Sequence, residues 1–197
     1  MFAGIAGRYD LANRVLSAGI DKRWRRRVIE IAGGDLSGKR ALDVACGTGD
    51  LTAELKRAGA DTVGVDFTFE MLRLAPPKTD ARGWIQGDGL KLPFRSSSFD
   101  LVAIAFGLRN VADRRVAFSE MLRVLVPGGR LVVLEFSMPR QDLLGRAYKG
   151  YLTHVLPRLG GVLAGDKAAY TYLDDTCLLY TSPSPRDQRG SRMPSSA

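Results

Sequence analysis

One stretch in the first third of the chain constrains its fold more than any other. The apolar run RALDVAC at residues 40–46 opens into the glycine-rich turn Gly47-Thr48-Gly49, and the helical pattern DLTAELKRA follows at 50–58. A buried strand, a glycine-rich turn and a helix in this order form the first unit of a parallel sheet that binds a ligand at its strand ends. Glycines let a ligand approach the backbone, and the helix N-terminus attracts negative charge.

The turn does not complete either of two common nucleotide-binding motifs. Thr52 stands where a third glycine would complete the dinucleotide pattern, and the Gly-Lys-Ser/Thr ending of a phosphate-binding loop does not follow. A Gly-x-Gly pair alone occurs in many turns. The nature of the ligand therefore depends on the loops that follow the later strands.

Strands and helices alternate along the rest of the body. We expect further strands at 62–66, 83–87, 99–106 and 130–136, and helices at 21–32, 68–75, 113–125 and 141–156. Thr68 and Asp113 are suitable N-caps, Pro76-Pro77 stops one helix, and Pro127-Gly128-Gly129 makes the turn before the last strand. The alternation predicts an α/β fold with a parallel sheet that is covered on both faces.

Composition excludes several classes of protein. With 45% apolar and 25% charged residues among 197, the chain is neither disordered throughout nor fibrous. No stretch approaches the roughly 18 uninterrupted apolar residues that a membrane-spanning helix needs. The N-terminus lacks the layout of a signal peptide, which predicts a cytoplasmic protein. Cys46 and Cys177 are too few for a disulfide framework or a cysteine zinc cluster, and we expect no metal site.

The net charge of +8 suggests an anionic partner, either nucleic acid or a membrane surface. Five of the cations flank Trp24 in the segment KRWRRR at 22–27. Binding of a nucleic acid would need more aromatic residues between the cations, so we expect no nucleic-acid partner. Two interpretations of the segment stay open. Its cations and its indole could contact anionic lipid, or it could be a solvated helix face with Trp24 packed inward.

Two acids follow later strands at positions that suit a nucleoside. Asp66 ends the second strand, about 20 residues past the glycines, where a carboxylate can accept both hydroxyls of a ribose. The pair Asp88-Gly89 follows the third strand, where an acid could accept an adenine amino hydrogen. Asp66 could instead be a helix cap or an exposed turn acid. The combination is more informative than each acid alone, because these loops converge on one crevice in a doubly wound sheet.

This arrangement resembles the class I S-adenosylmethionine-dependent methyltransferases. Longer segments are similar to the quinone-biosynthesis C-methyltransferases, which methylate the ring of demethylmenaquinone or of the corresponding ubiquinone precursor. The resemblance covers roughly residues 2–175 and is carried by LDVACGTGDLT, GDGLKLPFRSSSFD, FGLRNVADR, EMLRVLVPGGRLVVLEFS and HVLPRLGGVLAGDKAAYTYL.

The resemblance implies a Rossmann-like fold, a sheet in the order 3-2-1-4-5, and S-adenosyl-L-methionine as the cofactor. The substrate would be a polyprenyl quinol, and its long tail implies peripheral contact with the inner face of the membrane. The positions that match the family's cofactor site are Asp43, Gly47, Thr48, Gly49, Asp66, Asp88, Gly89 and Ala105.

The expected reaction is an in-line transfer of a methyl group to a ring carbon of a hydroquinone. Loss of a phenolic proton makes that carbon electron-rich, so a base or a cation near the phenolate should help. We expect Arg109 to stabilise the phenolate and Asn110 to orient the ring, both acting as catalytic and substrate-binding residues. Tyr9 belongs to a segment that resembles the family's lid and would contact the substrate. Arg109 could instead be a surface salt-bridge partner, and Tyr9 could be a packing residue. His154, the only histidine, could be a general base or a packing residue.

The end of the chain departs from the family. Residues 1–176 are expected to form the methyltransferase domain, whereas 177–197 are rich in Ser, Pro and Arg and are expected to be a disordered, non-native tail. The family continues past Leu173 with a helix and an antiparallel strand pair, so we expect the sheet to lack that pair and the chain to be poorly soluble and nearly inactive. Other possibilities are a methyltransferase for another small molecule or nucleic acid, and an inactive remnant that binds the cofactor. The oligomeric state stays open, a homodimer included.

Overall fold

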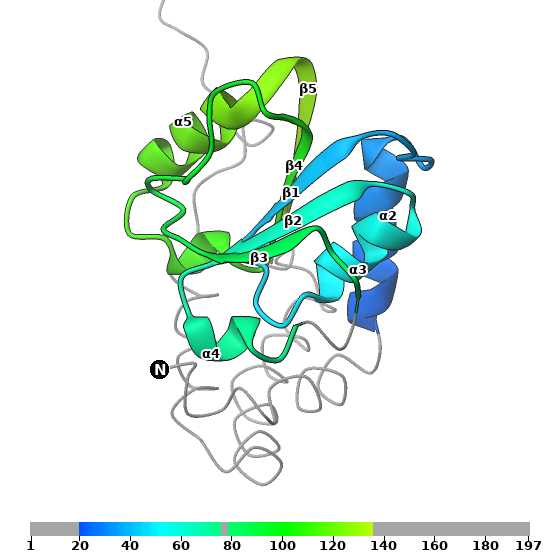
Figure 1. The fold of residues 1–197 in the computed structure, drawn as a ribbon, viewed down its shortest axis with the longest axis horizontal. Helices are drawn as coiled ribbons and strands as arrows, with labels where there is room; N and C mark the ends of the chain where they lie inside the picture. Colours follow the sequence, from blue (N-terminus) through cyan, green and yellow to red (C-terminus); the bar gives the residue numbers. More distant parts are fainter. Residues whose placement is uncertain (1–19, 76–78, 136–197) are drawn as a thin grey trace, which may run out of the picture.

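The computed structural model describes residues 20–75 and 79–135, and Figure 1 shows their arrangement. Five parallel strands form one sheet in the order β3-β2-β1-β4-β5, which confirms the predicted order. The strands are β1 (Arg40–Val44), β2 (Asp61–Asp66), β3 (Gly83–Gln86), β4 (Phe99–Ala105) and β5 (Leu125–Leu134). The helices are α2 (Ile20–Ala32), α3 (Asp50–Arg57), α4 (Phe69–Leu72), the 3-10 turn η3 (Leu108–Asn110) and α5 (Arg114–Val124).

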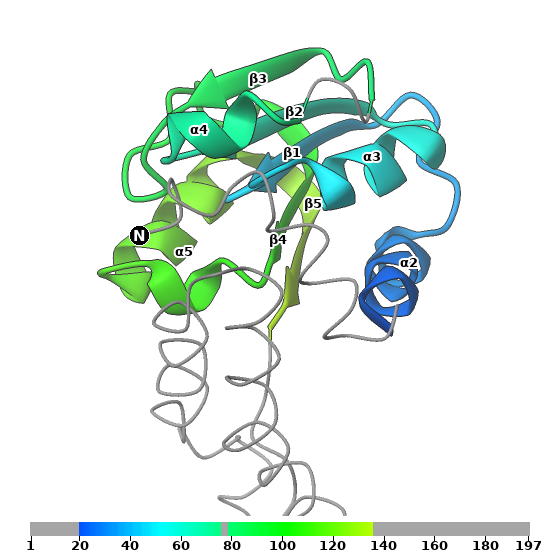
Figure 2. The same ribbon diagram turned by 90° about the horizontal axis from the view of Figure 1, so that it is seen from below.

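Helices cover both faces of this sheet, as the strand–helix alternation predicts. In Figures 1 and 2, α5 lies on one side of the central strands, and α2 and α3 lie on the other. The core cluster under α5 includes Leu42, Val102, Ile104, Met121 and Val124. The cluster on the opposite face includes Val28, Ala41, Leu55, Leu101 and Ala103. Because successive residues of a strand point to opposite faces, both faces of β1 and β4 must be apolar, and each large side chain buried there contributes about 1.5–3 kcal/mol.

The boundary of β5 differs from the sequence-based prediction. The strand was expected at 130–136 after a separate turn, but it begins at Leu125 and contains Pro127-Gly128-Gly129 as an irregularity. Phe99 pairs with Leu125 while Leu101 pairs with Arg130, so the extra residues of β5 loop out between two stretches of ladder. Gly128 has a φ of +79°, a left-handed conformation that a glycine adopts without strain.

Of the two predicted helix N-caps, one makes a capping hydrogen bond with its side chain and the other does not. Asp113 caps α5, because its Oδ1 accepts hydrogen bonds from the backbone N–H groups of Arg115 and Val116. Thr68 occupies the N-cap position of α4, but its side chain makes no capping bond. The helix itself is only four residues long, shorter than the predicted 68–75.

Several sequence-based predictions lie outside the described residues. These are Tyr9, the Pro76-Pro77 stop, the helix at 141–156 with His154, and the tail at 177–197. Within the described ranges, no helix combines the length and apolar character needed to cross a membrane.

Candidate active site

The turn after β1 has an unusual backbone. Ala45 and Gly47 have φ values of +54° and +55°, and Gly49, directly before α3, has +81°. A Cβ on Gly47 would meet nothing within 4 Å, so the backbone is open to an approaching ligand there. At Gly49 the space is filled, because a Cβ would lie 2.4 Å from the ring of Trp84 on β3. The two glycines of the motif therefore differ: Gly47 leaves room for a ligand, and Gly49 makes room for Trp84.

Asp43 lies beneath this turn and holds it to α3. Its side chain is buried, and its Oδ2 accepts a 2.6 Å hydrogen bond from the hydroxyl of Thr52. Burial raises the pKa of Asp43 to about 7, and the nearby charge of Asp66 acts in the same direction. Asp43 was predicted as a cofactor-site residue, but it is not among the residues that line the pocket described below. Its contact in this structure is with the helix that the motif opens.

Asp66 connects the turn after β1 with the turn after β2. Its Oδ2 accepts a 2.8 Å hydrogen bond from the N–H of Gly47, and its Oδ1 accepts one of 2.8 Å from the N–H of Thr68. Each carboxylate oxygen has a second lone pair for a further donor. The bond to Thr68 is the local turn contact that the alternative interpretation of Asp66 anticipated, and it is compatible with ribose binding.

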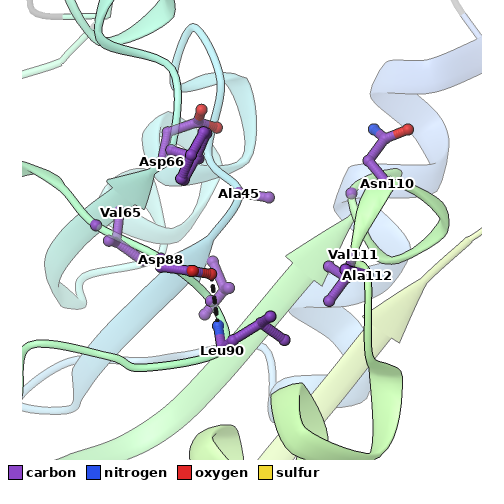
Figure 3. A pocket seen from close by; sticks show the side chains of 13 residues that line it. Ala45, Val65, Asp66, Asp88, Leu90, Asn110, Val111 and Ala112 are labelled. Atoms are coloured by element: carbon purple, nitrogen blue, oxygen red, sulfur yellow. Dashed lines mark hydrogen bonds between the residues drawn. The ribbon is translucent and has the colours of Figure 1, made fainter.

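A pocket of about 290 Å³ lies at the carboxyl ends of the strands. Asp66 and Asp88 lie on one side of it, and Asn110, Val111 and Ala112 lie on the other (Figure 3). Asp88 also accepts a 2.8 Å hydrogen bond from the N–H of Leu90, which shapes the loop after β3. The lining residues are Val44, Ala45, Val65, Asp66, Phe67, Gly87, Asp88, Gly89, Leu90, Gly107, Asn110, Val111 and Ala112.

The fold thus brings together four of the predicted site residues: Asp66, Asp88, Gly89 and Asn110. It also adds apolar walls that the sequence analysis did not single out, formed by Val65, Leu90 and Val111 among others. In the sequence, these apolar residues cannot be distinguished from core residues. Only their place at the strand ends could have indicated that they line a pocket. Two carboxylates on one side of a pocket with apolar walls suit a ligand with a flat ring and hydroxyl groups.

Four other predicted cofactor-site residues neighbour the pocket-lining residues in sequence but do not line the pocket themselves: Gly47, Thr48, Gly49 and Ala105. Thr48 is buried and Ala105 is half-buried. Ala105 is the last residue of β4 and pairs with Leu134 of β5. Beyond it, Phe106 has a φ of +56°, which is rare for a bulky side chain, and a Cβ on Gly107 would lie 2.5 Å from the Cβ of Ala45. The turns after β1 and β4 are therefore in close contact.

Arg109 forms a largely buried ion pair. Its side chain is 7% exposed, and its Nη1 lies 2.7 Å from Oε1 of Glu135, the first residue after β5. Arg109 is therefore a salt-bridge partner, as the alternative interpretation expected, but the pair is largely buried and does not lie at the surface. Glu135 was not singled out in the sequence, although it belongs to the LEFS segment that carries the resemblance.

Trp24 on α2 packs inward. Its ring lies 6.0 Å from that of Phe106, at an interplanar angle of 57°. Its neighbour Arg25 pairs with Asp21 at 2.5 Å and with Asp50 in the first turn of α3 at 3.2 Å. The indole is thus packed inward, as the second interpretation of the basic segment expects, and a contact with lipid would depend on the exposed cations.

Comparisons with known proteins agree with this geometry. The sequence profile of the ubiE/COQ5 methyltransferase family matches residues 1–183. The demethylmenaquinone methyltransferase of Thermus thermophilus is 49% identical over 189 residues, which cover 93% of this chain and 86% of that protein. The ubiquinone/menaquinone biosynthesis C-methyltransferase UbiE of Syntrophotalea carbinolica is 49% identical over 185 residues, with coverage of 89% and 76%. Among solved structures, a SAM-dependent methyltransferase from Thermotoga maritima has a TM-score of 0.61 at 23% identity, covers 79% of this chain and 69% of its own, and supports the fold alone.

Proposed function

Because the chain belongs to the ubiE/COQ5 methyltransferase family, we propose that it transfers a methyl group from S-adenosyl-L-methionine to a ring carbon of a polyprenyl quinol. The family and the fold make the chain a methyltransferase. The quinol is suggested by the names of its relatives, which act in menaquinone and ubiquinone biosynthesis. The observation that carries the proposal is the pocket where Asp66 and Asp88 face Asn110 at the carboxyl ends of the strands.

The residues present fit the proposed cofactor. Asp66 would accept the ribose hydroxyls with its remaining lone pairs, and Asp88 would accept an adenine amino hydrogen. Val65 and Leu90 offer apolar surface to the base, and the open backbone at Gly47 can receive the amino-acid end. When bound, S-adenosyl-L-methionine supplies an electrophilic methyl group on a sulfonium.

The protein's own contribution is to position the acceptor ring and to stabilise its charge. Asn110 lies on the pocket wall opposite the two acids, where its amide can orient a quinol oxygen. Arg109 precedes it, and its nearly buried guanidinium is surrounded by a medium of low dielectric constant. A cation in such a medium stabilises a phenolate more strongly than it would in water.

The proposal includes a peripheral contact with an anionic membrane, where a quinol with an isoprenoid tail resides. Four cations on α2 support it: Lys22, Arg23, Arg26 and Arg27 are exposed. Their spacing at i, i+1, i+4 and i+5 places them on one face of the helix. Arg25 and Trp24, in contrast, contact the body of the protein. The contact would therefore be electrostatic and would not use the indole.

Incubation of the purified chain with S-adenosyl-L-methionine and a short-chain demethylmenaquinol tests the proposal. From the sequence we expect the turnover of this chain to be low, but the methylated quinol and the S-adenosylhomocysteine that form should be equal in amount, measured by mass spectrometry. A reaction without quinol is the control for background hydrolysis. Binding of the cofactor without any methylated product would contradict the proposed activity and would favour an inactive cofactor-binding protein.

A further inference from the structure

Glu135 holds Arg109 at two points. Its Oε1 lies 2.7 Å from the guanidinium Nη1, and its Oε2 accepts a 3.2 Å hydrogen bond from the backbone N–H of the same arginine. The two side chains are 7% and 19% exposed, so this pair is largely removed from water. A single carboxylate thus fixes both the backbone and the charged end of one residue.

The position of the pair links it to the pocket. Arg109 lies in η3 just beyond β4, and Glu135 directly follows β5, the neighbouring parallel strand. Asn110, the next residue after Arg109, lines the pocket, and its N–H donates to the carbonyl of Gly107. A contact that fixes the backbone of Arg109 therefore also limits the position of Asn110.

A cation in this place needs a partner. Removing one member of a buried ion pair leaves an uncompensated charge and is strongly unfavourable. The carboxylate holds the guanidinium of Arg109 in place before any substrate binds, but it also offsets part of the positive field that a phenolate would experience. Glu135 can thus affect both the geometry and the strength of the proposed phenolate contact.

We propose that Glu135 is a positioning residue for the methyl acceptor, acting through Arg109. This inference rests on the proposed quinol methylation. It names the residue that would fix the position of the side chains that hold the quinol. Neither Glu135 nor Arg109 is among the residues that line the pocket, whereas Asn110, the neighbour of Arg109 in the chain, is.

The chain contains a matched control at the opposite edge of the same sheet. Asp100 accepts hydrogen bonds at its Oδ2 from the backbone N–H of Arg40, at 2.9 Å, and from the Nε of Arg40, at 3.4 Å. This is the same two-point contact between one carboxylate and one arginine. It is more exposed, at 50% for Arg40 and 27% for Asp100, and it joins the starts of β1 and β4, far from the strand ends.

The test compares Glu135→Gln with Asp100→Asn in the full 197-residue chain. We expect Glu135→Gln to lower kcat by about 10- to 100-fold, which is less than the roughly 100- to 1000-fold lost with a preorganised donor itself, because Glu135 acts through Arg109. Its affinity for S-adenosyl-L-methionine, measured by calorimetry, should stay within about twofold, because the two acids of the pocket are untouched. Asp100→Asn should leave both quantities unchanged.

The pH profile distinguishes positioning from a purely structural role. Without the carboxylate, less of the charge of Arg109 is offset, and the stronger positive field lowers the pKa of a nearby phenol. The acidic limb of the kcat profile should therefore move to lower pH in Glu135→Gln. Glu135→Asp keeps the charge but shortens the reach, so it should lower kcat and leave the limb in place. This second variant also serves if Glu135→Gln does not fold.

Three outcomes would overturn the inference. One is an unchanged kcat in Glu135→Gln, and another is an equal loss of kcat and cofactor affinity, which would make the residue structural. The third applies if Glu135→Gln does not fold: Glu135→Asp then has the same kcat as the unmodified chain. A different result, no quinol methylation by the unmodified chain, would show that the proposed function has failed and the inference with it.

Discussion

At the scale of single residues, Asp66 has two roles on one carboxylate, because it braces two loops and faces the pocket. We expect Asp66→Ala to weaken the binding of S-adenosyl-L-methionine by about 1.5–3 kcal/mol, the range for lost hydrogen bonds to charged groups. Isothermal titration calorimetry measures this loss. The matched control is Asp61→Asn, at the other end of β2, where Asp61 pairs with the exposed Arg82. Unchanged affinity in Asp66→Ala would show that the cofactor does not bind in this pocket.

Asp43 should make the stability of the fold depend on pH. Its pKa is raised from 3.8 to about 7, mainly by burial, so the folded state binds a proton that the unfolded state has already released between these values. Unfolding free energy should therefore fall as pH rises through this window. The upper limit is about 4 kcal/mol, since one pKa unit corresponds to about 1.4 kcal/mol.

The variant Asp43→Asn tests this, because its amide stays neutral and can still accept the hydrogen bond from Thr52. Urea unfolding at pH 5 and pH 8 should show a smaller loss of stability in Asp43→Asn than in the unmodified chain. Groups that do not interact with position 43 titrate equally in both proteins, so the difference reports Asp43 together with its charge interactions with Asp66 and Cys46. Identical losses in both would mean that Asp43 is ionised in the folded state throughout.

The site residues that could be predicted from the sequence are those whose function follows from their place after a strand. Asp66, Asp88 and Asn110 belong to this group, and the fold places all three on one pocket. Glu135 and Trp84 could not be found in this way, because their partners Arg109 and Gly49 are distant in sequence. A pairing between the ends of two neighbouring strands becomes visible only when the sheet order and register are known.

At the scale of elements, α5 supports the loop that carries Asp88. Arg123 donates from Nη1 to the carbonyl of Phe94 and from Nη2 to that of Leu92. Glu120 accepts a 2.9 Å hydrogen bond from the N–H of Leu92 and pairs with Arg123. The hydrogen bond from Arg123 holds the pKa of Glu120 below its usual value. The side chains of α5 thus bind one backbone N–H group and two backbone carbonyls of the loop after β3.

We expect Arg123→Met to loosen this loop while leaving α5 folded. Amide hydrogen exchange in residues 88–98 should become faster, because two loop carbonyls lose their partner. Binding of S-adenosyl-L-methionine should weaken several-fold as Asp88 becomes less fixed. Arg115→Met, at an exposed position of the same helix, is the control and should change neither quantity. Faster exchange confined to α5 would contradict a role in the loop.

Element boundaries were harder to predict than element types. The order of strands and helices followed from apolar periodicity, but β5 absorbs a Pro-Gly-Gly turn that the sequence places outside it. The reason is tertiary, since pairing with Phe99 of β4 extends the strand back to Leu125. α4 is short, and the sequence pattern could not show that only four residues would be helical.

At the scale of the whole molecule, the parallel sheet explains why distant segments form one site. All the strands of the described sheet run in the same direction, so the turns that follow β1, β2, β3 and β4 meet at one edge. The opposite edge holds the exposed Arg40–Asp100 pair. Because the binding loops lie at one end of the strands, substitutions in these loops can leave the packing of the core clusters on the two faces of the sheet unchanged.

The net charge of +8 leads to a prediction about membranes. We expect the protein to bind vesicles that contain anionic lipid, and to be released by salt, since exposed charges are screened over about 10 Å at 0.1 M ionic strength. Each cation near such a surface contributes about 1 kcal/mol. Replacing the exposed cations of α2 by glutamine should therefore greatly reduce vesicle binding. The four positions are Lys22, Arg23, Arg26 and Arg27.

The control for this experiment removes the same charge elsewhere. Its four replaced cations are also exposed, but they lie outside α2: Arg73, Arg82, Arg95 and Arg115. Co-sedimentation with vesicles should show strong loss for the α2 variant and a smaller loss for this control, because α2 concentrates its four exposed cations on one face, whereas the control positions lie on separate elements. Trp24→Ala should lower thermal stability without reducing the salt-sensitive binding, since the indole packs against Phe106. Equal losses in the two charge variants would mean that net charge alone governs the association, and undiminished binding by the α2 variant would place the membrane contact on another surface.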